Sequence, residues 1–208
     1  MDTGMMSGRF RTKARLTTAV VVATLLVAAS CSTNDPSGEG TRVVGSHSPT
    51  SAAANDRGDG GRLGTRANPV RHGLAVEVGQ EWQIALVDAN LNAIDVVLNT
   101  NPFNDPPAPG RQFVLLRFTV TYVGEGSGTP WIDLGIKFVG SQGNTYGGFE
   151  DYCGVIPDGL TDKGELFPGA STEGNVCMSV PADQIQGGSA MVELQLSLRP
   201  SRVFFAVS

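Results

Sequence analysis

The side chain with the clearest chemical role in the sequence is the thiol of Cys31, because of what precedes it. Residues 16–29 carry no charge and consist only of leucine, valine, alanine and threonine. Four basic residues precede this apolar run: Arg9, Arg11, Lys13 and Arg15. A basic segment, a short apolar segment and small residues at a cleavage site are typical of an export signal peptide. The run is shorter than the roughly 20 residues that a membrane-spanning helix needs.

Small residues lead directly into this thiol, and the junction resembles the lipobox of bacterial lipoproteins: Val27, Ala28, Ala29, Ser30 and Cys31. The resemblance implies cleavage before Cys31, whose thiol would carry a diacylglycerol with fatty acyl chains such as palmitate. Ala28 departs from the leucine or valine that is commoner at its place. Two alternatives stay open: a plain secretory signal cut at residues 28–30, which leaves Cys31 unmodified, and an uncleaved anchor. We predict a signal peptide at 1–30, lipid on Cys31 and a location on the extracytoplasmic face of the cell membrane.

The other two cysteines, Cys153 and Cys177, are an even pair once Cys31 is set aside for lipid. Disulfides persist outside the cytoplasm, so we predict that these two residues pair. Closing such a loop would stabilise the fold by about 3.5 kcal/mol on the chain-entropy model. A redox motif or a zinc site would need C-x-x-C spacing or further ligands, and the two histidines, His47 and His72, have no cysteine or histidine nearby.

Five carboxylates lie between the expected fourth strand, 132–138, and Cys177: Glu150, Asp151, Asp158, Asp162 and Glu165. Calcium takes six to eight oxygen ligands, so this cluster is a candidate calcium site. Its spacing matches no EF-hand loop, however, and we favour a solvated acidic loop. We therefore expect no metal and no other cofactor.

The sequence lacks the common signatures of catalysis and of nucleic-acid binding. It has no Gly-x-Ser-x-Gly elbow, no P-loop and no His-Glu-x-x-His. Residues 1–30 hold four basic residues and one acidic residue, so their removal changes the net charge from −5 to −8. An acidic chain lacks the basic footprint that phosphate backbones require. We expect neither an enzyme nor a nucleic-acid partner.

Composition divides the rest of the chain in two. Residues 31–66 are rich in Gly, Ser, Thr, Asn and Asp and contain no aromatic residue, which predicts a disordered tether. From residue 67 to 208 short segments alternate apolar and polar residues, and the 27 Gly and 12 Pro of the chain favour turns over helices. We expect about seven strands and no convincing helix: 74–78, 82–86, 113–122, 132–138, 176–180, 192–198 and 203–207. The pattern predicts an all-β, immunoglobulin-like antiparallel β-sandwich over 67–208.

Several short motifs in this region also carry a family resemblance. They lie at residues 64–69, 101–104, 140–146, 167–169 and 174–177. In this order they resemble the immunoglobulin-like domain of unknown function in exported lipoproteins of actinobacteria and other Gram-positive lineages, which is related in fold to a secreted mycobacterial immunogenic protein. The resemblance implies an extracytoplasmic β-sandwich, and it brings no catalytic residues to this chain.

Two functions follow for such a domain. The first is a noncatalytic module that binds an envelope protein or another envelope component, because loops on a tether suit presentation to partners. The alternative is a small-ligand carrier or accessory lipoprotein with a pocket between the sheets. Three aromatic residues are candidates for a binding face, although we favour core or rim positions for them: Trp82, Trp131 and Phe149.

Overall fold

The computed structural model describes residues 61–197 and 201–208. The expected signal peptide, Cys31 and most of the expected tether lie outside these residues, as does Leu198 of the last-but-one expected strand.

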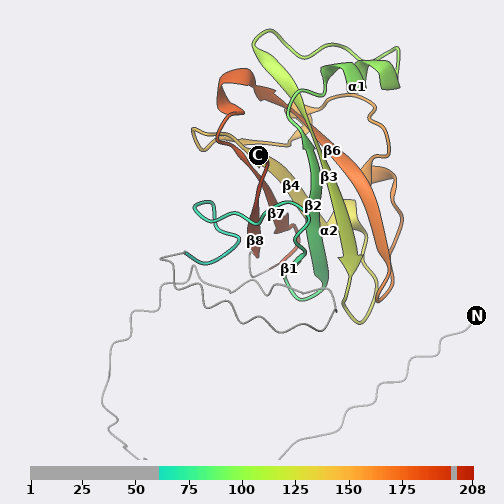
Figure 1. Cartoon of the computed structure of the whole chain (residues 1–208). Helices are drawn as coiled ribbons and strands as arrows, with labels where there is room; N and C mark the ends of the chain where they lie inside the picture. The colour runs from blue at the N-terminus through green and yellow to red at the C-terminus, as the bar shows by residue number, and fades with distance from the viewer. Residues whose placement is uncertain (1–60, 198–200) are drawn as a thin grey trace, which may run out of the picture. The chain divides into compact units, whose positions relative to one another are not determined.

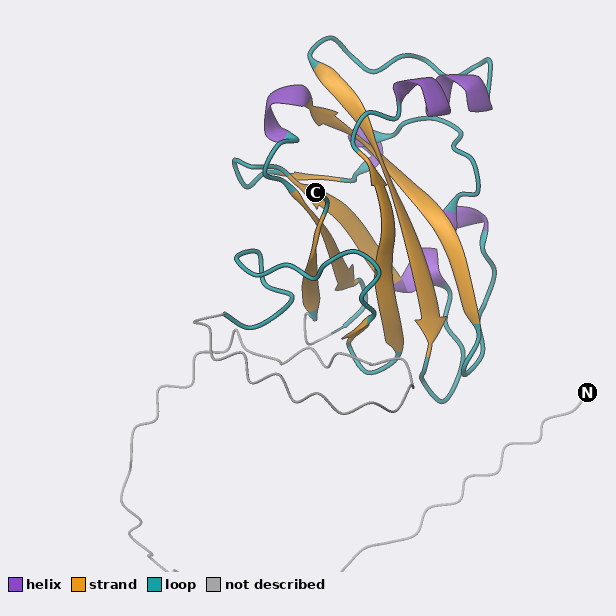
Figure 2. Cartoon of the chain, in the orientation of Figure 1, coloured by secondary structure: helices purple, strands orange, loops and turns teal. Residues whose placement is uncertain are grey.

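Two four-stranded antiparallel sheets form the domain (Figure 1). The first sheet has the order β1-β2-β3-β6: Val76–Val78, Trp82–Asn90, Arg111–Tyr122 and Ser171–Pro181. The second has the order β5-β4-β7-β8: Thr145–Tyr146, Leu134–Val139, Ser189–Leu194 and Arg202–Ala206. Short helical segments connect the strands (Figure 2): α1 at Ile94–Thr100, α2 at Pro130–Asp133, η1 at Phe149–Asp151, η2 at Leu160–Asp162 and η3 at Ala182–Gln184.

The connections confirm the immunoglobulin-like sandwich. β3 pairs with β6 in the first sheet, while β7 lies between β4 and β8 in the second. The chain must therefore cross between the sheets from β3 to β4, from β5 to β6 and again from β6 to β7. The pairing of β3 with β6 corresponds to the B–E pair of immunoglobulin-like domains. The neighbours β4, β7 and β8 correspond to strands C, F and G.

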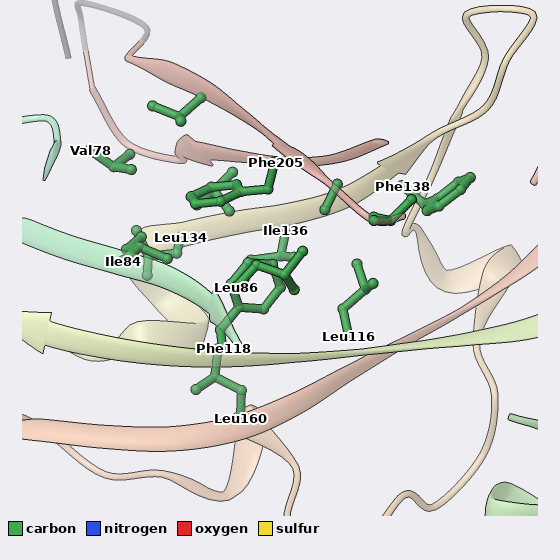
Figure 3. Close-up of a cluster of buried hydrophobic side chains, with 14 of the residues drawn as sticks. Val78, Ile84, Leu86, Leu116, Phe118, Leu134, Ile136, Phe138, Leu160 and Phe205 are labelled. Carbon is green, nitrogen blue, oxygen red and sulfur yellow. The ribbon is translucent and has the colours of Figure 1, made fainter. Parts of the chain in front are cut away.

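The main core fills the space between the sheets, as the alternation in the sequence predicts. Val114, Leu116 and Phe118 of β3 are fully buried, whereas Arg117 and Thr119 point away from the core. Figure 3 shows the side chains of both sheets meeting in this space. The rings of Phe118 and Phe205 meet edge to face across it, with centroids 5.8 Å apart. Such contacts add to the hydrophobic stabilisation of the burial itself.

All seven expected strands differ from the observed strands at one end or both, and three of these differences have a clear physical reason. Ile132 and Asp133 belong to α2, because Pro130 at the first helical position starts a helical turn and β4 begins only at Leu134. The strand expected over 176–180 extends back to Ser171, since the backbone of 171–175 pairs with β3 although its side chains show no apolar alternation. The strand expected over 192–198 ends at Leu194, and Leu196 is exposed because the chain turns away from the sheet. β5 was not expected.

A second, smaller core lies on the outer face of the first sheet, and the sequence pattern did not predict it. Phe113 and Leu115 of β3 point away from the main core, yet both are buried. They pack with Val97 of α1 and with Cys153. The prediction of no helix was therefore wrong at α1, a helix too short for helical periodicity to stand out. In the parts of the chain that the structure describes, no helix is long and apolar enough to cross a bilayer.

The end of the expected tether already packs on the sandwich. Leu63 contacts the main core, and the carbonyl of Gly64 accepts a hydrogen bond from the backbone N–H of Phe204 at 2.9 Å. The Arg66 guanidinium donates to the carbonyl oxygens of Gly140 and Ser141. Ordered contacts thus begin before residue 67, because Leu63 packs on the main core and Arg66 bonds to the turn after β4.

Replacing Phe118 by alanine should lower the free energy of unfolding by about 3–5 kcal/mol, because it removes a fully buried ring that contacts Phe205. Chemical denaturation measures this. The matched control is Phe103→Ala, which truncates the same residue type at a site 90% exposed and should change stability by less than about 0.5 kcal/mol. Equal effects of the two variants would contradict this description of the core.

Candidate binding groove

A groove of about 490 Å³ opens between two loops at the end of the sandwich where β3 begins. One wall is the loop from α1 to β3, chiefly residues 103–108, and the other is the segment 150–154 around η1. Arg111, Phe113 and Ser179 line the groove between these walls. Figure 1 shows α1 at the same end of the domain. The groove therefore lies outside the two sheets, and main-core side chains occupy the space between them.

The side chain of Asn104 ties the two walls together. Its Nδ2 donates to the carbonyl oxygens of Val97 in α1 and Val155 beyond η1, both at 2.7 Å, and its Oδ1 accepts from the N–H of Val155 at 2.8 Å. Gly154 permits this close approach, because its φ is +91° and a Cβ there would lie 2.3 Å from Asn104 Oδ1. Two loops distant in sequence are thus held at a fixed separation.

Arg111 fixes the second wall to the first sheet. Its guanidinium forms an ion pair with Asp151 at 2.5 Å, and its Nε donates to Ser179 Oγ at 2.9 Å. The other oxygen of Asp151 accepts the N–H of Gly147 at 2.9 Å, and the guanidinium lies over the ring of Tyr146. Both charged side chains are largely shielded from water, so this pair is screened less than a surface salt bridge.

A disulfide between Cys153 and Cys177 anchors the same wall, in agreement with the pairing expected from the sequence. Cys177 lies on β6 and Cys153 in the loop after η1. Both sulfur-bearing residues pack against the smaller core with Phe113 and Leu115. The loop is therefore joined to the outer face of the sheet by a covalent bond and by apolar burial.

Aromatic rings stand exposed at the rim of the groove. Phe103 is 90% exposed and Tyr152 is 70% exposed, although both line the groove. Phe149, which precedes the groove residue Glu150, is fully exposed. We call Phe103 and Tyr152 the aromatic rim. Asn101 fixes the position of Phe103 in the loop, because its side chain accepts the N–H of Phe103 at 2.9 Å.

The three aromatic residues singled out in the sequence have different environments. Trp82 is fully buried and meets Tyr122 edge to face, as the core interpretation predicts. Trp131 is half exposed on α2, and Phe149 is fully exposed in η1. Phe103 and Tyr152 were missed as site residues. The one available signal was the Asn-Pro-Phe-Asn segment at 101–104, whose turn-forming residues present a large apolar side chain in a loop.

The groove carries an excess of negative charge. Asp105, Glu150 and Asp151 line it, and Arg111 is the cation among its lining residues. Arg111 is already engaged by Asp151. Asp105 and Glu150 form no ion pair within 61–197 and 201–208, so their charges face the groove and the solvent without a cationic partner.

Three of the five carboxylates in the acidic segment have partners, which differ from one to the next. Asp158 is held by Lys163 and, at 2.9 Å, by Arg117; hydrogen bonds from Lys163 and then Arg117 lower the pKa of this carboxyl. Asp151 pairs with Arg111, and Glu165 accepts a hydrogen bond from a serine hydroxyl. Among the residues that the structure describes, no three Asp, Glu, His or Cys side chains gather to hold a metal ion. Asp151 and Asp158 are therefore engaged by cationic side chains of the domain itself.

Comparison with solved structures found distant neighbours of the domain. The secreted protein MPT63 of Mycobacterium tuberculosis is 15% identical, with a TM-score of 0.44 over 67% of this chain and 98% of that one. An uncharacterised β-sandwich protein of Clostridium difficile is 7% identical, with a TM-score of 0.39 over 67% and 95%. A conserved hypothetical protein of Bacillus anthracis is 10% identical, with a TM-score of 0.35 over 59% and 87%. No protein-family model and no curated protein matches the chain.

Replacing Cys153 and Cys177 together by serine should lower the free energy of unfolding by about 3.5 kcal/mol, because the closed loop between them spans 24 positions. Urea denaturation measures the loss, and hydrogen exchange should show faster opening of residues 149–156. A reductant should weaken the native protein in the same way and leave the double variant unchanged. If the double variant were as stable as the native chain, the disulfide would not be what fixes this wall.

Proposed function

We propose that the chain is an exported lipoprotein, anchored through Cys31, whose β-sandwich is a noncatalytic binding module. The groove between residues 103–108 and 150–154 is its contact site. The observation that carries this proposal is the aromatic rim on two loops whose separation is fixed. The proposed partner is a protein of the cell envelope.

The exposed rings support a contact surface. Aromatic side chains that protrude into water at a groove gain most from burial by a partner, and such residues supply much of the binding energy at protein interfaces. Phe103 and Tyr152 contribute little to the fold, because they contact solvent over most of their surface. Their exposure is therefore better explained by binding than by stability.

The fixed walls support the same proposal. Asn104, the Arg111–Asp151 ion pair and the disulfide each hold one or both walls. A binding site that is ordered before the partner arrives loses less conformational entropy on binding.

The chemistry of the groove favours binding over catalysis. Its cysteine, Cys153, has no free thiol because it forms the disulfide with Cys177. The hydroxyl of Ser179 accepts a hydrogen bond from Arg111. A nucleophilic serine needs an adjacent base to accept its proton, and a guanidinium stays protonated. These residues therefore serve the architecture of the site.

The anchor is tested by replacing Cys31 with alanine in the full chain. We expect the variant to leave the membrane fraction and to lack the mass of the diacylglycerol, because the thiol is the proposed attachment point. Fractionation and intact-mass spectrometry measure both effects. Ser32→Ala, which keeps the thiol, should stay membrane-bound with its lipid. A Cys31→Ala protein that remained in the membrane at an otherwise unchanged mass would disprove the anchor.

The contact site is tested by photo-crosslinking in intact cells. Phe103 is replaced by p-benzoylphenylalanine, and the matched control carries the same group at Phe167, which is 61% exposed in another loop. Because only position 103 lies at the groove, we expect a discrete protein adduct from that position and none from position 167. Electrophoresis of the purified chain after irradiation shows the adducts. Equal adducts from both positions, or none from position 103, would contradict the proposed contact site.

A further inference from the structure

We propose that the groove recognises a basic segment of its protein partner, one that presents arginine or lysine side chains to the aromatic rim. This inference rests on the proposed function and specifies the chemistry of the partner.

The charges of the groove give the first reason. Its lining has three carboxylates against one guanidinium, and Asp151 already satisfies that guanidinium. Asp105 and Glu150 therefore remain to attract a cation on the partner. An anionic segment would be repelled by both carboxylates and would find Arg111 occupied, so complementarity selects a basic partner.

The aromatic rim gives the second reason. A cation that lies over the face of an aromatic ring is attracted by the ring's negative face, and guanidinium groups are especially suited to this contact. Each wall of the groove carries one ring and one unpaired carboxylate: Phe103 and Asp105 on one, Tyr152 and Glu150 on the other. A cationic side chain in the groove can therefore contact a ring and a carboxylate together.

The exposure of the rings indicates a protein segment in preference to a small cation. Phe103 and Tyr152 both line the groove, yet most of each ring is exposed, and a small molecule inside the groove would leave much of that surface in water. A polypeptide that crosses the groove can cover both rings while its basic side chains enter. The volume of about 490 Å³ is large enough for several side chains.

The test uses the full-length lipidated chain in detergent micelles and a fluorescein-labelled peptide in which arginine and serine alternate. A second peptide of equal length has glutamate in place of arginine. We expect fluorescence anisotropy to show binding of the arginine peptide alone, with an affinity that falls as salt rises. Asp105→Asn combined with Glu150→Gln should weaken binding about tenfold, and Phe103→Ala should weaken it several-fold.

The matched control is Glu81→Gln combined with Glu125→Gln, which removes two exposed carboxylates near the far end of β3 and should leave binding unchanged. Four results would overturn the inference: no binding of the arginine peptide, equal binding of the glutamate peptide, an unchanged affinity of the Asp105 and Glu150 double variant, or competition by arginine amide as strong as by the peptide. The last result would indicate a site for small cations. If any of these four results occurred while the crosslinking experiment still gave a protein adduct at position 103, the proposed function would hold. The partner would then have a different chemistry.

Discussion

The first half of β3 is buried on both faces, and the candidate site depends on this constraint. Val114 and Leu116 face the main core, while Phe113 and Leu115 point the other way and need a second cover. An exposed row of such side chains would be unfavourable in water, so α1 and the disulfide-linked loop pack over them. The groove forms between the loop that follows α1 and the disulfide-linked segment 150–154. The groove and the fold therefore depend on the same small core.

The main sheets could be predicted from the sequence where one face of a strand is polar, as in the second half of β3. Residues 116–122 alternate cleanly, and the structure places them as expected. The pattern fails where backbone pairing, and not side-chain burial, determines the strand, as at Ser171–Asn175. It also fails at α1, whose burial against the outer face of β3 is a tertiary effect that no local periodicity reports.

The candidate site was less predictable than the fold. The cysteine pair follows from counting residues, but the groove arises from the contact between Asn104 and Val155, which are 51 positions apart. Carboxylates that look equivalent in the sequence also differ in the structure. Asp151 and Asp158 are held by cations, whereas Glu150 is left to face the groove. Only the folded arrangement separates the carboxylates that support the loops from those that can meet a partner.

Under the proposed anchor, the tether and the groove have complementary roles. A groove with fixed walls loses little entropy on binding, but two exposed rings and two carboxylates supply only modest affinity to a free partner. Confinement to a membrane raises the local concentration of the groove near envelope proteins and makes modest affinity sufficient. The composition of residues 31–66 predicts a disordered tether with a reach on the order of 30 Å, which would allow the groove to sample orientations above the membrane. In this proposal the groove determines which partner binds, and the anchor determines how often the two meet.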